Sequence, residues 1–193
     1  MIKIRHVLTA SVAAAALIAL VPAPSLAEPS PLAPSGLQPV QDQIDAQLRI
    51  TSGGTQTGSN EISWNNGRVK MVFSAGEATP PRSLDAAAAA NWHGCPSGWY
   101  CFYENENFNE RSNGTTVGRR LQFSDTDVWQ YFINYGFQDK TTSWVNRNYW
   151  TVTVQNSNPN GQYWDIWEEP AQSLSANVGS ADNDKADRFY CDF

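Results

Sequence analysis

The segment from Cys95 to Trp144 constrains the fold more than any other part of the 193-residue chain. It opens with two cysteines, Cys95 and Cys101, that enclose a proline and a glycine, residues typical of turns. Eight of the ten residues from Trp99 to Phe108 are aromatic, cysteine or asparagine. This composition favours strands and turns over helices, so the segment predicts a β-rich domain.

Residues 1–27 have the pattern of a secretory signal peptide. Lys3 and Arg5 form a basic start, the run Val12–Val21 is apolar, and Ser25 and Ala27 supply the small residues before a cleavage site. A membrane-spanning helix needs about 20 apolar residues, more than this run offers. We therefore expect a secreted, extracellular protein that begins at Glu28 and keeps no membrane segment after cleavage.

The charge of the mature chain excludes several partners. Removing residues 1–27 takes away two of the 13 basic residues and none of the 19 acidic ones, so the net charge becomes 11 − 19 = −8. Nucleic acids need clustered lysine and arginine, and anionic lipid surfaces attract basic segments. We expect neither partner, and we expect a monomeric protein.

Three cysteines are present: Cys95, Cys101 and Cys191. Secretion permits disulfides, and the five-residue gap between the first two makes them the natural pair. Cys191 is left over, and an odd cysteine is either a buried thiol or a link between chains. We favour the buried thiol.

Residues 28–92 read as a linker or prosegment, or as a small subdomain that leans on the main domain. Residues 28–39 are rich in proline, and 78–90 contain Pro80–Pro81 followed by alanines, so both predict linkers. Between them, apolar residues at 40, 44 and 48 are compatible with a short amphipathic helix.

A β-hairpin is predicted at residues 62–73. Asn66–Gly67 is the strongest two-residue turn signal, and it places Trp64 opposite Val69 and Ile62 opposite Met71. A lone hairpin is marginal in water, so this N-terminal appendage must dock on another element.

Residues 93–193 predict an all-β Greek-key sandwich. Short alternating runs recur, separated by glycine, asparagine, aspartate and proline. Two segments, Asp139–Trp144 and Asp184–Phe189, share the pattern Asp-Lys-x-x-x-aromatic. Two copies of one Greek-key motif, related by a pseudo-twofold axis, would account for this repeat.

These residues also carry a family resemblance. Cys-Pro-Ser-Gly-Trp-Tyr-Cys-Phe-Tyr-Glu (95–104), Leu-Gln-Phe (121–123) and Tyr-Gly-Phe-Gln-Asp-Lys-Thr-Thr-Ser-Trp-Val-Asn (135–146) resemble the bacterial secreted metallopeptidase-inhibitor family with a βγ-crystallin-like fold. The resemblance covers about 93–193. It implies a protein that inhibits a secreted peptidase, in particular a metallopeptidase, without being an enzyme.

The chain departs from the family in two places. Tyr103 and Phe108 begin the aromatic signature of the fold, but Glu110 stands where glycine is expected, and an apparent insertion, 110–117, follows. The cysteine-closed loop in which members of the family can present their reactive segment has no counterpart here. Two other loops qualify by position: 110–117, with Glu110, Arg111 and Asn113, and 156–161, with Asn158 and Asn160.

Catalytic groups are sparse. His93 is the one histidine after residue 27, which argues against histidine-based catalysis and zinc binding. Asp165, Glu168 and Glu169 lie among Trp164 and Trp167, as in a glycosidase cleft, but a solvated strand end is the favoured interpretation. We expect most of the eight tryptophans to lie in the core.

No cofactor is expected, with calcium as the open alternative. Residues 138–143 and 183–188 resemble the calcium motif of βγ-crystallin domains, whose oxygen ligands would come from Asp139, Thr142, Ser143, Asn183 and Asp184. The same hydroxyls also tie down a folded hairpin in this fold, and we favour that structural role. The alternative function is a non-inhibitory βγ-crystallin structural module that binds calcium or cell-wall carbohydrate.

Overall fold

The computed structural model describes residues 40–78, 92–124 and 128–192. The predicted signal peptide, the first linker and most of the second linker lie outside these residues. None of the helices in the described ranges has the length and apolarity that a membrane span requires.

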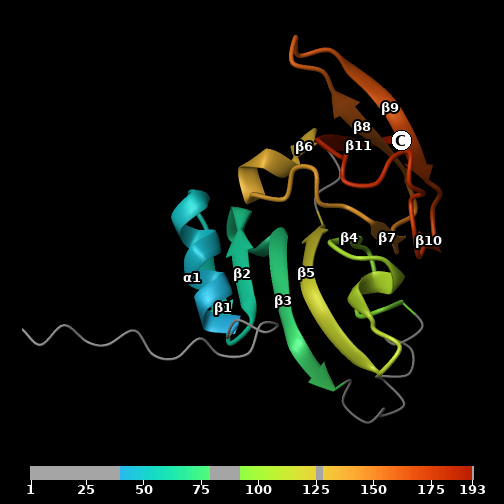
Figure 1. Ribbon diagram of the computed structural model, residues 1–193. Helices are drawn as coiled ribbons and strands as arrows, with labels where there is room; N and C mark the ends of the chain where they lie inside the picture. Colours follow the sequence, from blue (N-terminus) through green and yellow to red (C-terminus); the bar gives the residue numbers. More distant parts are fainter. Residues whose placement is uncertain (1–39, 79–91, 125–127, 193) are drawn as a thin grey trace, which may run out of the picture. The chain divides into compact units, whose positions relative to one another are not determined.

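One α-helix, α1 (Val40–Ile50), and eleven strands make up most of the described chain (Figure 1). The helix confirms the amphipathic pattern at 40, 44 and 48. Three short 3-10 turns are η1 (Asn65–Gly67), η2 (Asn107–Asn109) and η3 (Phe132–Tyr135). The strands are β1 (Thr55–Gly58), β2 (Glu61–Trp64), β3 (Val69–Ala78), β4 (Tyr100–Tyr103), β5 (Thr115–Phe123), β6 (Gln130–Tyr131), β7 (Ser143–Asn146), β8 (Thr151–Ser157), β9 (Tyr163–Glu169), β10 (Ser173–Ser175) and β11 (Arg188–Asp192).

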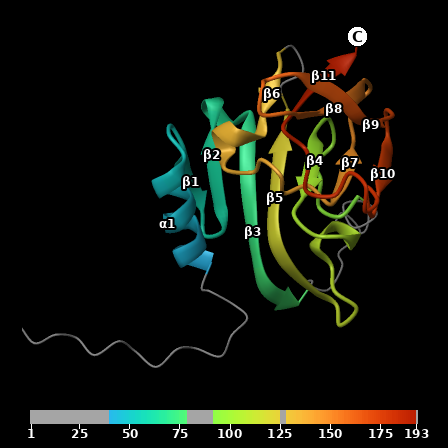
Figure 2. The same ribbon diagram turned by 45° about the horizontal axis from the view of Figure 1, so that its top comes forward.

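The strands form two antiparallel sheets, and each of two four-stranded motifs contributes one strand to the sheet of the other motif. The first sheet has the order β1-β2-β3-β5-β4-β7-β10, and the second has the order β6-β11-β8-β9. In the first motif, β4, β5 and β7 share a sheet while the third strand, β6, crosses to the other. In the second motif, β8, β9 and β11 share a sheet while β10 crosses back. The predicted all-β Greek-key sandwich is therefore confirmed (Figures 1 and 2).

The repeated Asp-Lys segments meet at the centre of this exchange. The Asp139 N–H donates to the Ala186 carbonyl at 3.1 Å, and the Asp184 N–H donates to the Thr141 carbonyl at 3.3 Å. The N–H of each aspartate thus donates to the carbonyl of the residue two positions after the aspartate of the other segment. Both aspartates have left-handed backbone, with φ of 55° and 56°. The reciprocal bonds and matching torsions are those of two motifs related by an approximate twofold axis.

The N-terminal hairpin extends the first sheet. Ile62 pairs with Met71 and Trp64 with Val69, as the Asn-Gly turn predicts. The tip adopts positive φ at Asn65 and Asn66, a conformation that asparagine tolerates. β3 then pairs with β5 from Val69–Phe123 to Ala78–Thr115. Residues 69–78 are therefore bonded into the sheet of the main domain. The choice between a prosegment and a subdomain for residues 28–92 stays open.

Helix α1 packs against the same region. Figures 1 and 2 show it beside β1 and β2. Ile44 is buried in the core, and Gln47 Nε2 donates a hydrogen bond to the Tyr135 carbonyl at 2.8 Å. The helix thereby connects the N-terminal hairpin with η3 of the first motif.

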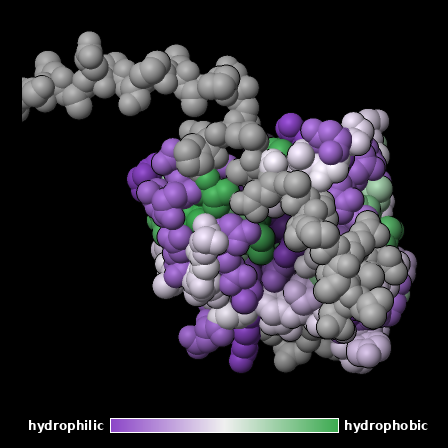
Figure 3. Space-filling model, turned by 90° about the horizontal axis from the view of Figure 1, so that it is seen from below, coloured by the Kyte–Doolittle hydropathy of each residue, from purple (hydrophilic) through white to green (hydrophobic). Residues whose placement is uncertain are grey.

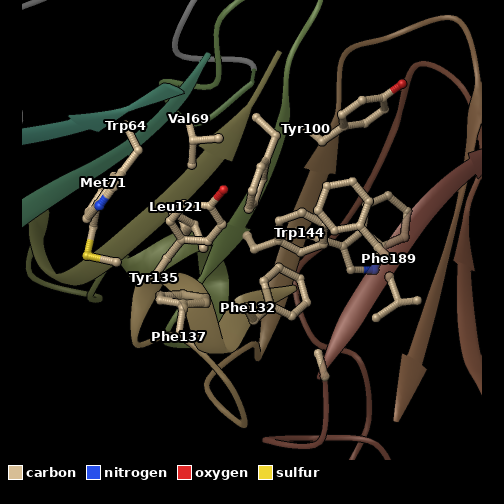
Figure 4. Close-up of a cluster of buried hydrophobic side chains, with 14 of the residues drawn as sticks. Trp64, Val69, Met71, Tyr100, Leu121, Phe132, Tyr135, Phe137, Trp144 and Phe189 are labelled. Atoms are coloured by element: carbon tan, nitrogen blue, oxygen red, sulfur yellow. The ribbon is translucent and has the colours of Figure 1, made fainter. Parts of the chain in front are cut away.

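The main core lies between the two sheets and is strongly aromatic. Phe102 contacts Phe132 and Phe189 with ring centroids 4.8 and 5.0 Å apart, distances typical of favourable aromatic pairs. Trp144, Leu121 and Phe123 are buried in the same cluster, and Figure 4 shows Trp144 and Leu121 there. Cys191 is buried there too and lies outside the disulfide.

A second, smaller core surrounds the disulfide. Cys95 and Cys101 are bonded, as predicted, with their Cα atoms 5.9 Å apart. Tyr103, Phe108 and Val145 complete this cluster. The bridge thus ties the entry of the domain to the start of β4 and stabilises the turn by restricting the unfolded chain.

The expectation that most tryptophans lie in the core is met in part. Trp64 and Trp144 are buried, Trp92, Trp99 and Trp167 are partly buried and pack against the two core clusters, and Trp129, Trp150 and Trp164 are more than a third exposed. Phenylalanine and tyrosine supply most of the aromatic rings of the main core. Exposed tryptophans are therefore available for binding.

Candidate functional site

The loop 110–117 forms the tip of a hairpin. The Arg111 N–H donates to the Thr115 carbonyl at 2.8 Å, and the Gly114 N–H donates to the Arg111 carbonyl at 2.9 Å. Asn113 Oδ1 accepts hydrogen bonds from the Thr115 N–H and hydroxyl. The predicted residues Glu110, Arg111 and Asn113 are all exposed.

The base of this loop is held by His93. Its Nδ1 lies 2.9 Å from Glu110 Oε1, and its ring stacks on Phe108 with centroids 3.7 Å apart. Glu110 has an extended backbone, so no left-handed residue is needed where the family pattern has glycine. Instead Asn107, Phe108 and Asn109 carry the positive φ values of the folded hairpin.

The loop 156–161 connects β8 and β9 and projects at the top of Figure 1. One side chain organises it. Asn158 Oδ1 accepts from the N–H groups of Asn160 and Gln162 at 2.9 and 3.1 Å, and its Nδ2 donates to Gln162 Oε1 at 3.0 Å. The backbone adds the bonds Asn158 N–H to Gln162 and Gly161 N–H to Asn158. Hydrogen bonds thus stiffen this loop, which lacks the cysteines that close the reactive loop in members of the family.

The two candidate loops lie at opposite ends of the domain in Figure 1, so one peptidase cleft can receive only one of them. Figure 3 views the molecule from the end that lies at the bottom of Figure 1, where the tip of 110–117 is found. The described residues visible there are mostly hydrophilic.

The calcium candidates are partly used by the fold itself. The Thr142 hydroxyl donates to the Glu104 carbonyl at 3.0 Å, and the Ser143 hydroxyl donates to the Asn105 carbonyl at 2.7 Å. Ser143 Oγ also accepts from the buried Phe108 N–H at 3.1 Å. These bonds perform the structural role that the sequence favours.

The acidic members of the set lie close to one another. Asn183 Nδ2 donates to Asp184 Oδ2, and both residues line a depression together with Thr142 and Glu104. Burial raises the pKa of Asp139, and the neighbouring Asp187 raises it further. Within the described ranges, no group of three or more histidine, cysteine, aspartate or glutamate side chains is placed to hold a metal ion. Calcium binding stays the untested alternative to the structural role.

The carboxylates of β9 do not form a catalytic pair. Asp165 and Glu168 are exposed, whereas Glu169 is fully buried. The expected solvated strand end is therefore wrong for Glu169, a residue that sequence reasoning missed. Burial raises the pKa of Glu169 well above its ordinary value, although a 3.0 Å hydrogen bond from Trp167 Nε1 to Oε1 opposes this effect. No local signal marks this burial, because the pairing of β9 with β8 is irregular between the partners of Val154 and Gln155, which changes the face that the alternation selects.

Glu169 and two other polar groups meet in the core. Tyr100 is buried, and its pKa is raised by burial, by the nearby Cys191 thiol and by the nearby Glu169 carboxyl. These groups are buried in the core between the two sheets.

Comparison with known proteins finds one family model that matches part of the chain. Residues 88–170 match a family of peptidase inhibitors, which bind a peptidase and are not enzymes. The matching family is peptidase inhibitor family I36, and the segment that carries its pattern includes the disulfide, the first Greek-key motif and the β8–β9 hairpin. The comparisons with curated proteins and with solved structures gave no match.

Proposed function

We propose that the protein is a secreted inhibitor of metallopeptidases that inserts the loop 156–161 into the peptidase cleft. The observation that carries the proposal is the stiff, exposed tip of the β8–β9 hairpin inside the segment that matches the inhibitor family. The family resemblance of residues 95–146 supports a metallopeptidase as the target.

Stiffness is the property that an inhibitory loop requires. A segment that binds in a cleft loses conformational entropy, and this loss is smaller when the free loop already has its bound conformation. Asn158 supplies three side-chain hydrogen bonds across the tip. The exposed Pro159 and Asn160 stand at the outermost part of the turn, where they would meet the cleft first.

The loop 110–117 is the alternative reactive segment. Asn113 bridges its tip as Asn158 bridges the other one, but with bonds to Thr115 alone. This similarity provides a matched pair of substitutions. Asn158→Ala and Asn113→Ala each remove the side chain that organises one tip, at opposite ends of the domain.

The test measures inhibition of thermolysin, a zinc peptidase, with subtilisin as a serine-peptidase control. We expect inhibition of thermolysin alone. Asn158→Ala should weaken it at least tenfold, about 1.4 kcal/mol in binding free energy, and Asn113→Ala should leave it within about twofold. The reverse pattern would assign inhibition to the loop 110–117. Absence of inhibition across a panel of metallopeptidases would refute the proposed target class.

A further inference from the structure

The outer face of the second sheet carries a row of four side chains, one from each strand. The pairing places Tyr131 of β6 opposite Arg188 of β11, Arg188 opposite Gln155 of β8, and Gln155 opposite Asp165 of β9. Their neighbours in these strands, such as Phe189 and Val154, point into the core. The row therefore crosses the whole sheet at a right angle to its strands, on the side away from the core.

Hydrogen bonds connect the row from end to end. Arg188 Nη1 donates to the Tyr131 hydroxyl at 3.2 Å, and Arg188 Nε donates to Gln155 Oε1 at 2.8 Å. Gln155 Nε2 then donates to Asp165 Oδ1 at 2.7 Å. With strands about 4.8 Å apart, the four side chains extend over about 14 Å. Each side chain is held in place before any ligand arrives.

Aromatic rings flank the row. The Arg188 guanidinium carbon lies 3.9 Å from the centre of the Trp129 ring and 3.4 Å from that of Tyr163. Tyr190 lies beside Trp129, with ring centroids 4.5 Å apart. Trp129 remains 41% exposed and Tyr163 37% exposed. Exposed aromatic rings whose orientation is fixed by a stacked arginine differ from the scattered apolar residues of an ordinary surface.

The chemistry of this surface selects one ligand class. Sugar rings present C–H faces that stack on aromatic rings and hydroxyl groups that bond to carboxylates, amides and guanidinium groups. Asp165, Glu168 and Asp192 are exposed on the same face, and the mature chain has a net charge of −8. This charge opposes polyanions such as nucleic acids and acidic polysaccharides.

We propose that the outer face of β6, β11, β8 and β9 binds a neutral polysaccharide, with Trp129 and Tyr163 as stacking platforms and the row from Tyr131 to Asp165 as the polar contacts. The row of side chains crosses all four strands, so it suits an extended chain whose successive sugars meet successive strands. This site is distinct from the proposed inhibitory contact, although Tyr163 begins β9 directly after the loop 156–161. An inhibitor bound to a wall polysaccharide would be kept where secreted peptidases act.

The test is affinity electrophoresis of the purified protein in native gels that contain hydroxyethylcellulose, laminarin or glycol chitin, with alginate as the anionic probe. We expect retardation by at least one neutral polymer and none by alginate. Trp129→Ala and Tyr163→Ala should each weaken the retardation at least tenfold. Trp150→Ala is the matched control, because Trp150 is 40% exposed but lies at the other end of β8 from Gln155.

Melting temperatures of the three variants separate binding from folding, and Trp129→Phe keeps a ring at that position if the alanine variant unfolds. The proposal is overturned if no neutral polymer retards the protein, if only alginate does, or if Trp150→Ala loses binding equally. It is also overturned if sedimentation shows a dimer that Trp129→Ala dissociates, because the face would then be a protein interface. Inhibition of thermolysin should be unchanged in Trp129→Ala, so failure here and failure of the proposed function are separable.

Discussion

Glu169 is a fully buried carboxyl group whose second oxygen, Oε2, has no hydrogen-bond partner among the described residues. Burial raises its pKa well above the ordinary value, so the folded protein binds this proton more tightly than the unfolded chain. The stability that the protonated group allows is fully present below the ordinary pKa of 4.5 and is lost as the pH rises through the raised folded value.

Glu169→Gln should therefore increase the melting temperature at neutral pH. It should also reduce the fall in melting temperature as the pH rises above the ordinary pKa of 4.5. The amide carries no charge at any pH, and its oxygen can still accept from Trp167 Nε1. Thermal melts from pH 4 to pH 9 provide the measurement. Glu168→Gln, on the exposed neighbouring position, is the control and should shift stability at neutral pH by less than about 0.5 kcal/mol. A less stable Glu169→Gln protein at neutral pH would contradict this account.

The burial of individual residues was predictable where a repeating sequence pattern determines which face of a strand each side chain occupies. Leu121 and Phe123 alternate with polar neighbours, which is the pattern of a half-buried strand, and both are buried. The short gap between Cys95 and Cys101 predicted the disulfide. The exposure of Trp129 and the burial of Glu169 were not predictable in this way. Both depend on contacts between strands that are far apart in the sequence, since Trp129 stacks on Arg188 and Glu169 faces Tyr100.

At the scale of elements, Ser143 connects β7 to the folded hairpin that precedes β5. Its Oγ accepts from the buried Phe108 N–H and donates to the Asn105 carbonyl. Ser143→Ala should cost about 1–3 kcal/mol in stability, because it leaves a buried donor unsatisfied. Chemical denaturation in the presence of EDTA measures this cost in the absence of calcium.

Calcium distinguishes the two roles of this residue. If Ser143 is structural, the cost of Ser143→Ala is the same in EDTA and in millimolar calcium, and calcium does not raise the melting temperature of the native protein. A calcium ligand would instead give a native protein that is stabilised by calcium through mass action. Ser175→Ala, which removes a hydroxyl bonded only to the Asn177 carbonyl, is a matched control of small expected effect.

Elements were predicted well where the signal is local. The Asn-Gly turn determined the hairpin register, and the apolar spacing at 40, 44 and 48 determined the helix. The pairing of β3 with β5 was not predictable, because no local pattern specifies which strand covers the edge of a Greek-key sheet. The stiffness of the loop 156–161 was also missed, since it depends on the rotamer of Asn158.

At the scale of the whole molecule, residues 40–78 contribute to the same core as the family-matched segment. Five of their side chains are almost completely buried in the main cluster: Ile44, Ile62, Val69, Met71 and Phe73. Burial of one such side chain is worth about 1.5–3 kcal/mol. Their joint contribution is comparable with the whole stability of a small domain, about 5–15 kcal/mol.

A chain that begins at His93 should therefore fail to fold cooperatively. It would expose the edge of β5 together with Leu121 and Phe123, which are buried in the complete protein. Bare edges of this kind pair with other chains, so we expect aggregation and binding of a hydrophobic dye. A chain that begins at Gly36 keeps helix α1 and the hairpin, and it should melt as the protein that begins at Glu28 does. A chain 93–193 with an undiminished melting temperature would show that residues 40–78 are a separable prosegment, and the first sheet would then be complete at β5.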